Sequence, residues 1–328
     1  MNGVAYVAGA PSPPNTPYDA DVIILALDRP RETVQAICSA LRQTGVSHHI
    51  FVLDQGSAPA NLHQLARFVA QQQGVTLFRV AHNRGVAGGR NCASALGHGR
   101  VILGLDNDAE FATADAVARA VAAIDADPDL AAIGFRIVAH ATGIDDLSSW
   151  GYPKTLLEHA AGVFEAATFI GAGHAIRRAA WHQAGRYDEA LFFCWEEFDF
   201  SLRAINLGWR VRYHGDIVVR HKVSRERRQE WSGERWFFSV RNRLYIARKW
   251  GAPWISLAPR YAGYLLKGLL RGTALQTIRA LPAAIRLSAS IPVGELSSQA
   301  RIYLRRHDKV HRGSPLLRIR HELFGRLS

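Results

Sequence analysis

The chain has 328 residues, 48% of them hydrophobic and 21% charged, which excludes a disordered or fibrous protein and allows one large domain with an appendage. Its three cysteines are too few and too scattered for a disulfide framework or a Cys-x-x-Cys zinc site. Residues 220–328 carry 23 Lys and Arg against 6 Asp and Glu, whereas residues 1–219 carry 17 against 22. We therefore expect the last third of the chain to face an anionic partner.

The N-terminal stretch, residues 1–19, contains four prolines and is expected to form a flexible lead. It has neither the basic region nor the long apolar run of a signal peptide, which argues against secretion. A reducing compartment also fits the low cysteine content. Together these features predict a cytoplasmic protein.

Residues 21–140 show alternating strand and helix patterns. Four short apolar runs are typical of buried parallel strands, at 22–27, 50–53, 75–80 and 101–105. Stretches compatible with helices follow them, such as 32–41 and 62–70. This alternation predicts an α/β fold with a mostly parallel central sheet flanked by helices. In such sheets, ligands bind beyond the carboxyl ends of the strands.

Acidic residues follow three of these four strands, namely Asp28, Asp54 and the pair Asp106 and Asp108. One Asp at such a position is often a turn-former or a helix N-cap, but repetition at successive strand ends indicates a site. The carboxylates of Asp106 and Asp108 are hard oxygen ligands, which suit Mg²⁺ or Mn²⁺ with open positions for a diphosphate.

A glycine-rich turn at 83–91 is expected to open the helix that follows the third strand, and its backbone amides can cradle a phosphate. Its glycines fall at positions 85, 88 and 89, so the turn lacks the Gly-x-Gly-x-x-Gly spacing of a dinucleotide fingerprint. This spacing argues against a simple dehydrogenase.

Glu196 and Glu197 lie in the expected first turn of a later helix. Acidic residues there are often solvated charges that favour the helix dipole. In this chain they are bracketed by aromatic residues: Phe192, Phe193, Trp195 and Phe198. A carboxylate in partly apolar surroundings can have a raised pKa and can act as a general base.

A series of motifs runs in order over residues 20–250. It comprises Asp28-Arg29-Pro30, Asp54-Gln55-Gly56-Ser57, the turn from Asn83 to Asn91, Asp106-Asn107-Asp108, Gly171-x-Gly173, Gly185 to Glu189, Trp195 to Arg203, Gly208-Trp209, His221 and Arg241-Asn242. Each motif is weak alone, but the ordered series resembles the family 2 glycosyltransferases, and within them the rhamnosyltransferase-like bacterial members. The resemblance implies a catalytic domain of the GT-A fold that transfers a sugar from a nucleoside diphosphate with inversion at the anomeric carbon.

The resemblance also implies roles for individual residues. Those expected to lie at the bound substrates are Ala26, Asp28, Asp54, Arg84, Gly89, Arg90, Asp106, Gly171, Trp195 and Arg241, with Asp54 on the donor base. Those expected to hold Mg²⁺ or Mn²⁺ are Asp106, Asp108 and His221. Glu197 is the expected catalytic base, with Glu196 and Asp199 as alternatives. The family usually has an Asp at the position of Glu197, so this chain departs from the pattern there.

The C-terminal region, residues 251–328, is expected to be a basic, amphipathic and helical extension. Five cations in it are predicted to share one helix face, namely Arg260, Lys267, Arg271, Arg279 and Arg286, and Pro259 and Pro282 are predicted to break the helix. Such a surface fits an anionic membrane, here the inner face of the cell membrane. The alternative is a helix that packs on the catalytic domain or on another subunit.

The sequence thus predicts a glycosyltransferase that moves a sugar, from dTDP-rhamnose or a UDP-sugar, to a glycan or lipid-linked acceptor in cell-surface polysaccharide synthesis. One alternative is a nucleotidyltransferase, which would normally need a glycine-rich loop close to the first strand. The other is a non-catalytic basic protein that binds membranes or nucleic acid. Nucleic acid is not expected, because the cations alternate with aliphatic rather than aromatic side chains. The oligomeric state stays open.

Overall fold

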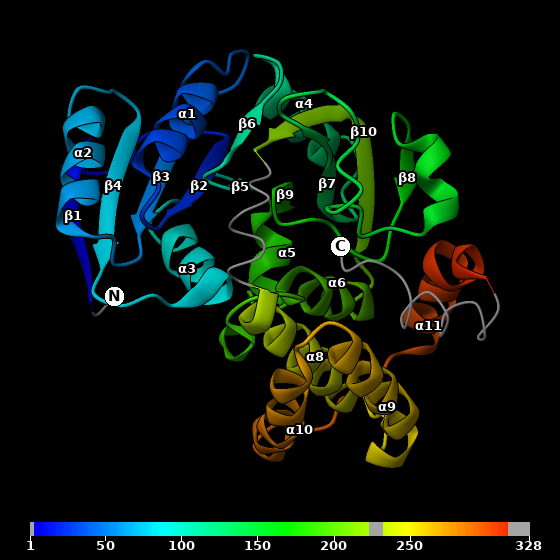
Figure 1. The fold of residues 1–328 in the computed structure, drawn as a ribbon. Coiled ribbons are helices and arrows are strands. Elements are labelled where there is room, and N and C mark those ends of the chain that lie inside the picture. Colours follow the sequence, from blue (N-terminus) through cyan, green and yellow to red (C-terminus); the bar gives the residue numbers. More distant parts are fainter. Residues whose placement is uncertain (1–2, 223–231, 314–328) are drawn as a thin grey trace.

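The computed structural model describes residues 3–222 and 232–313 (Figure 1). Within these residues, ten strands form one sheet in the order β1-β4-β3-β2-β5-β9-β7-β10-β6, with β8 paired to β10. The strands are β1 Val4–Gly9, β2 Ala20–Ala26, β3 His48–Asp54, β4 Val75–Val80, β5 Val101–Leu105, β6 Ala109–Phe111, β7 Leu130–Ala139, β8 Val163–Glu165, β9 Gly173–Arg177 and β10 Arg210–His221. Six of these ten, β2, β3, β4, β5, β7 and β10, run in one direction, so the sheet is mostly parallel as predicted.

Helices cover both faces of the sheet. Those described are α1 Pro30–Leu41, α2 Pro59–Val69, α3 Gly85–Ser94, α4 Ala116–Asp125, α5 Arg178–Gln183, α6 Glu196–Asn206, α8 Ser232–Lys249, α9 Trp254–Leu270, α10 Ala274–Ala289 and α11 Ser298–Leu304. One core joins the sheet to α1, α2 and α4, and the second joins it to α3, α5 and α6. Because β2, β3 and β5 are buried on both sides, their sequences are continuous apolar runs rather than alternating ones.

The N-terminal residues differ from the prediction. Val4–Gly9, inside the expected flexible lead of residues 1–19, form β1 and pair antiparallel with β4, with Val4 opposite Val80 and Gly9 opposite Thr76. The strand satisfies backbone groups that would otherwise be unpaired along the edge of β4. Gly9 ends it with a positive φ of 90°, where a Cβ would lie 2.2 Å from the Val75 carbonyl oxygen.

The C-terminal helices α8, α9 and α10 form a separate layer below the sheet in Figure 1. They share a third hydrophobic core, made of Trp236, Val240, Leu244, Leu257, Tyr264, Ala280 and Ala284. The boundary predicted between a catalytic domain, residues 20–250, and the extension therefore separates α8 from the helices on which it packs. The end of the extension, residues 314–328, lies outside the described residues.

The predicted breaks at Pro259 and Pro282 are wrong, because both prolines lie inside helices, in α9 and α10. A proline removes only one backbone donor, and here the shared core holds the helices together around it. The chain reverses instead at Gly272, whose φ is +71°. The amide of Thr273 beside it donates to the Gly268 carbonyl oxygen at 2.7 Å, as in a glycine-terminated helix end.

The reversal also breaks the predicted row of five cations, because α9 and α10 fold back on each other. Lys267 is only 6% exposed, and its Nζ lies 5.8 Å from the centre of the Trp236 ring. The single helix face that was predicted for the five cations therefore does not continue across the turn. None of the described helices is both long and apolar enough to cross a membrane.

The chain then returns to the sheet. Ala300 and Leu304 of α11 join the core around α6, and the Tyr303 hydroxyl accepts a hydrogen bond from the Val211 amide of β10 at 3.2 Å. Removal of the whole C-terminal third would therefore expose core side chains of the catalytic sheet.

Candidate active site

The structure brings the three predicted metal ligands together. Asp106 directly follows β5, and Asp108 directly precedes β6. β6 pairs antiparallel with the end of β10, which places Ala109 opposite His221. As a result, one ligand atom from each of Asp106, Asp108 and His221 lies within 4.8 Å of the other two.

His221 is held between two carboxylates. Its Nε2 lies 3.3 Å from Asp108 Oδ1, and its Nδ1 lies 3.2 Å from Asp146 Oδ2. Burial lowers the pKa of His221, but hydrogen bonds to Asp108 and Asp146 and the charges of Asp108 and Asp106 more than offset this effect and raise the pKa to about 9. The arrangement leaves Nε2 facing the cluster while Nδ1 faces Asp146.

Asp146 is a residue that the sequence analysis missed. It lies in the loop after β7, where its carboxylate accepts hydrogen bonds from the Ser148 amide at 3.0 Å and the Ser149 hydroxyl at 2.7 Å. A metal-binding histidine commonly donates its second ring nitrogen to such a carboxylate, which fixes the orientation of the ring. Only a local Asp-x-Ser-Ser pattern marks Asp146 in the sequence, and this pattern is also typical of an ordinary turn.

Arg29 contributes a cation to the same cluster. Its guanidinium forms an ion pair with the Asp108 carboxylate, and it stands at the end of β2, beside the start of α1. Burial alone would raise the pKa of Asp108, but His221 and Arg29 lower it below its usual value. Arg29 was part of a recognised motif, but no role had been assigned to it.

Arg90 lies between the predicted metal ligands and the predicted base. The residue is 4% exposed, and its guanidinium is 2.9 Å from Asp106 Oδ1 and 2.9 Å from Glu197 Oε1. It also donates to the Gly171 carbonyl oxygen at 2.7 Å. A Cβ at Gly171 would lie 2.4 Å from Glu197 Oε1, so glycine is the residue that allows this close approach.

The three candidate bases occupy different environments. Burial raises the pKa of Glu197, although Arg90 opposes the effect, and the side chain keeps 13% of its exposure. Glu196 is more deeply buried, and burial and the charge of Glu197 raise its pKa well above the usual range. Asp199 has no exposure and forms ion pairs with Arg203 at 2.9 Å and Lys249 at 3.0 Å. Among the three, Glu197 best combines access with a raised pKa.

The turn before α6 has an unusual backbone. Phe192, Cys194 and Trp195 all have positive φ values, of 60°, 69° and 72°. Non-glycine residues rarely adopt this conformation, and they keep it only where surrounding contacts enforce it. Each of these residues lies within five positions of Glu197, so the turn sets where the carboxylate points.

Helix α8 supplies those contacts. The Asn242 side-chain nitrogen is within hydrogen-bond distance of the carbonyl oxygens of Leu191, Phe193 and Cys194, at 2.8–2.9 Å. Next to it, Arg241 donates to the carbonyl oxygens at positions 190 and 191, each at 2.8 Å. The Arg241 guanidinium thus holds the turn, and its predicted contact with substrate stays a prediction.

Trp195 also faces α8. Its indole nitrogen donates to the Ser239 carbonyl oxygen at 3.1 Å, and the Arg243 guanidinium lies 4.8 Å from its ring centre. The ring therefore has protein partners on this side, and its predicted contact with substrate stays a prediction.

The residues expected at the donor lie at the ends of β2 and β3, where Ala26 pairs with Asp54. Asp54 is fully buried. One of its carboxylate oxygens accepts from two backbone amides at 3.2 Å, and the other has no partner among the described residues. Asp28, with a φ of +49°, accepts from the Ala58 amide at 2.8 Å and from Asn61 at 2.9 Å. The structure thus brings these residues together, and Asp54 retains hydrogen-bonding capacity.

Two further predicted residues lie around α3. Gly89 allows a close approach of Gln55, because a Cβ would lie 2.8 Å from its side-chain oxygen. That oxygen accepts from the Arg84 amide at 3.1 Å. The Arg84 side chain lines a hollow of about 180 Å³ together with Val4 and Glu189.

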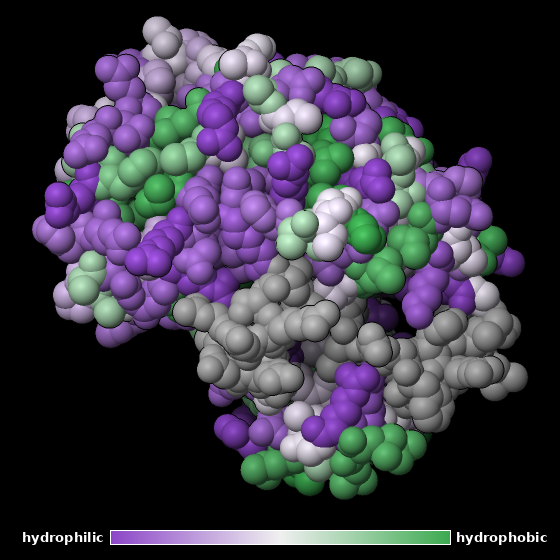
Figure 2. Space-filling model, turned by 45° about the horizontal axis from the view of Figure 1, so that its top comes forward, coloured by the Kyte–Doolittle hydropathy of each residue, from purple (hydrophilic) through white to green (hydrophobic). Residues whose placement is uncertain are grey.

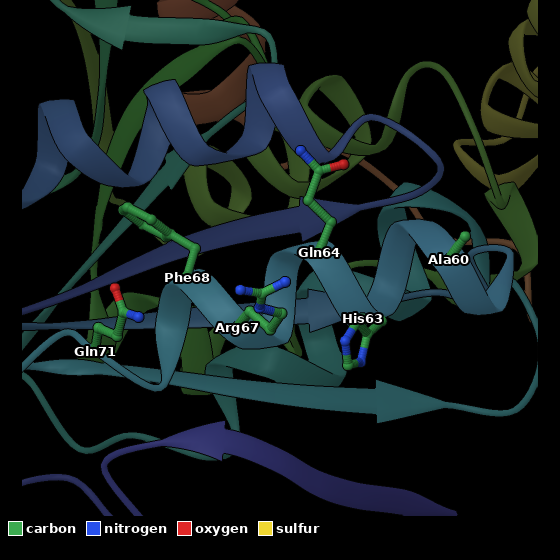
Figure 3. A pocket seen from close by; sticks show the side chains of 6 residues that line it. All are labelled: Ala60, His63, Gln64, Arg67, Phe68 and Gln71. Atoms are coloured by element: carbon green, nitrogen blue, oxygen red, sulfur yellow. The ribbon is translucent and has the colours of Figure 1, made fainter.

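A larger hollow, of about 320 Å³, lies on the outer face of α2 (Figure 3). Its lining residues are Ala60, His63, Gln64, Arg67, Phe68 and Gln71. It contains no carboxylate and none of the predicted site residues. Size alone therefore does not identify the site here, and the convergence of carboxylates, His221 and Arg90 does.

Comparison with known proteins gives the following similarities. A family model described as Glycosyl transferase family 2 matches residues 21–184, half of the chain. No curated protein sequence matches. The mannosyltransferase PcManGT from Pyrobaculum calidifontis, solved in complex with GDP-Man and Mn²⁺, is 18% identical with a TM-score of 0.59, over 97% of this chain and 88% of that chain. GalNAc-T7, solved with UDP, GalNAc and Mn²⁺, is 16% identical with a TM-score of 0.62, over 95% of this chain and 59% of that chain.

Proposed function

This chain belongs to glycosyl transferase family 2 and has the GT-A fold, and on this premise we propose that it transfers a sugar, with inversion, from a nucleoside diphosphate to an acceptor hydroxyl. One observation carries the proposal: Arg90 joins Asp106 of the metal-ligand cluster to Glu197, a carboxylate with a raised pKa. A cation site beside a general base is what this transfer requires.

The three candidate ligand side chains fit a divalent cation. Asp106 and Asp108 offer carboxylate oxygens, and His221 offers an imidazole nitrogen whose ring is oriented by Asp146. The nitrogen ligand favours Mn²⁺ over Mg²⁺, which binds oxygen ligands almost exclusively. When bound, the cation neutralises charge that builds on the leaving diphosphate.

The chain itself performs one proton transfer. The acceptor hydroxyl gives its proton to Glu197 as its oxygen bonds to the anomeric carbon, and the bond from that carbon to the diphosphate oxygen breaks. Attack from the face opposite the diphosphate inverts the configuration. Arg90 fixes the Glu197 carboxylate relative to Asp106, which keeps the base at a set distance from the donor.

The nucleotide and the acceptor are narrower parts of the proposal. We propose that Asp54, one of whose carboxylate oxygens has no hydrogen-bond partner among the described residues, accepts a hydrogen bond from the N–H of a uracil, thymine or guanine base. The solved relatives carry GDP-Man or UDP, and dTDP-rhamnose remains the subfamily expectation. A glycan or lipid-linked hydroxyl is the proposed acceptor, in cell-surface polysaccharide synthesis.

A thermal-shift panel tests the proposal. The protein is heated with UDP, dTDP, GDP or, as a control, ADP, each with and without Mn²⁺, because a ligand that binds the folded state raises the melting temperature. We expect one nucleotide to give a shift that needs the metal and that Asp108→Ala abolishes. The sugar donors of that nucleotide are then assayed for nucleoside diphosphate release. The proposal would be contradicted if none of UDP, dTDP and GDP gave a metal-dependent shift.

A further inference from the structure

The turn between α9 and α10 presents an apolar surface. Five large side chains within eight residues of Gly272 are between 46% and 70% exposed: Leu266, Leu269, Leu270, Leu275 and Ile278. Figure 2 shows hydrophobic atoms gathered over α9 and α10 at the lower end of the molecule. We call these five residues the hairpin tip. Contiguous exposed apolar surface of this kind marks an interaction site more often than scattered single residues do.

The exposure follows from how the two helices pack. Leu266, Leu269 and Leu270 follow the i, i+3, i+4 spacing of one face of α9, while Leu257 and Tyr264 on the opposite face lie in the core shared with α8. On α10, Ile278 is exposed and Ala284 is buried in that core. Since one side of each helix is already used for packing, only the exposed side is available to a partner.

The charge around the hairpin tip is of one sign. Residues 254–294, which include α9 and α10, contain five Lys and Arg and no Asp or Glu. Arg271 stands in the turn itself, and Arg279 and Arg286 follow on α10 at the seven-residue spacing that keeps both on one face, beside Ile278. In the boundary region of an anionic bilayer, the headgroup phosphates lie next to the acyl chains. Apolar side chains can insert between the acyl chains there, while arginines beside them contact the phosphates.

We infer that the hairpin tip docks this protein on a membrane surface rich in anionic phospholipid. The leucines of α9 and α10 enter the acyl boundary, and the arginines contact the headgroup phosphates. The long stretch without a carboxylate favours a lipid surface over a second copy of this chain, whose matching face would carry the same positive charge. The inference does not depend on the proposed transfer reaction, because docking needs neither donor nor acceptor.

Vesicle flotation with the full chain tests the inference. Vesicles of phosphatidylcholine alone are compared with vesicles that also contain phosphatidylglycerol, and we expect the protein to float with the second kind and to be released as salt rises. The variant Leu269→Ser/Leu270→Ser/Leu275→Ser should lose more than ~tenfold in partitioning, because three leucines no longer leave water. The matched control, Leu207→Ser/Ile302→Ser/Val310→Ser, removes equally exposed side chains elsewhere and should float like wild type.

Two further measurements separate the contributions and the alternative. Arg279→Glu/Arg286→Glu should abolish the preference for phosphatidylglycerol, since charge reversal acts on the headgroup contact alone. Equal flotation of the leucine variant and its control would overturn the inference. So would a wild-type dimer in size-exclusion chromatography that the leucine variant converts to a monomer without any vesicle binding, because the tip would then be a subunit interface. Unchanged melting temperatures confirm that the variants are folded.

Discussion

Between β5 and β6, carboxylates are matched with individual cations, whereas residues 254–294 carry five cations and no carboxylate. The first arrangement fixes side chains: Arg29 holds Asp108, and Arg90 holds Asp106 and Glu197. The second leaves an excess of one sign near an exposed apolar tip. Balanced charges suit a site that positions a reaction, and an excess of one sign suits a surface that meets an external partner.

This contrast predicts a separation of effects. Variants of Arg29, Arg90 and the carboxylates that they hold should reduce turnover and leave vesicle flotation unchanged. Variants at the hairpin tip should reduce flotation and leave turnover unchanged, when turnover is measured with a water-soluble acceptor. One variant that changes both readouts equally would show that the two regions act as one.

Glu197→Gln should lower kcat by about 10²–10⁴-fold, because the amide cannot accept the acceptor proton. Donor affinity should change little. The wild-type kcat should fall at acid pH as Glu197, whose pKa burial raises, becomes protonated, and this acid limb should vanish in the variant. Steady-state kinetics across pH give both readouts.

Glu196→Gln is the matched control for that experiment. Burial and the charge of Glu197 raise the pKa of Glu196 well above its usual range, which favours the neutral form, and glutamine is a neutral group of the same shape. We expect kcat within about threefold of wild type, well below the effect of losing a general base. A loss as large as that of Glu197→Gln would move the base to Glu196.

Asp108→Ala should reduce turnover by roughly 10²–10³-fold, because the cluster loses a ligand and with it several kcal/mol of charge stabilisation. Wild type treated with a chelator should fall equally and recover on addition of Mn²⁺. Asp129→Ala, a substitution of an exposed Asp outside the cluster, serves as the control. Turnover in Asp108→Ala that matches this control would remove the metal site from the mechanism.

Asp146→Ala should weaken Mn²⁺ binding by about 10–100-fold, since nothing then orients the His221 ring. Asp146→Asn keeps an oxygen that accepts from Nδ1 and should restore part of that affinity. Titration of Mn²⁺ against the melting temperature measures both variants. Identical affinities in Asp146→Ala and wild type would assign Asp146 to loop structure alone.

Asn242→Ala should lower the free energy of unfolding by about 1–3 kcal/mol, because buried carbonyl oxygens of the turn before α6 lose their donor. We also expect a severalfold lower kcat, as Glu197 loses its fixed position. The control is Asn206→Ala, at the other end of α6, because this asparagine also links two segments of the chain by a side-chain hydrogen bond. Loss of stability with an unchanged kcat would show that the turn does not set the base.

The sequence predicted the sheet well because its parallel strands carry a local signal. The apolar runs at 22–27, 50–53, 75–80 and 101–105 are confirmed as β2 to β5. β1 gave no such signal, since Val4–Gly9 is short and contains two Ala and a Gly, and its pairing with β4 depends on contacts about 70 residues away. The break in the C-terminal helices was likewise set by Gly272 rather than by the prolines.

Within the site, sequence order predicted which residues meet but not what they do. Asp106, Asp108 and His221 do come together. Arg90 was expected at the bound substrates, and the structure adds that it is buried and that its guanidinium bonds two carboxylates, Asp106 and Glu197. The position of Asp146 is set by the loop after β7, and the turn before α6 is held by Asn242 of α8, a helix far along the chain. The hydrophobic periodicity of the sequence carries no information on either.

Helix α8 limits where this chain can be joined to another in a chimera. Its Trp236 and Leu244 pack in the core with α9 and α10, and its Asn242 holds the turn that leads into α6. Chimeras that exchange C-terminal helices between relatives must therefore place the junction where both sets of contacts survive. A seam after residue 249 would divide the bundle, and a seam before α8 would replace Asn242 with whatever residue the donor sequence supplies. The C-terminal helices could thus be exchanged only together with the turn that leads to Glu197.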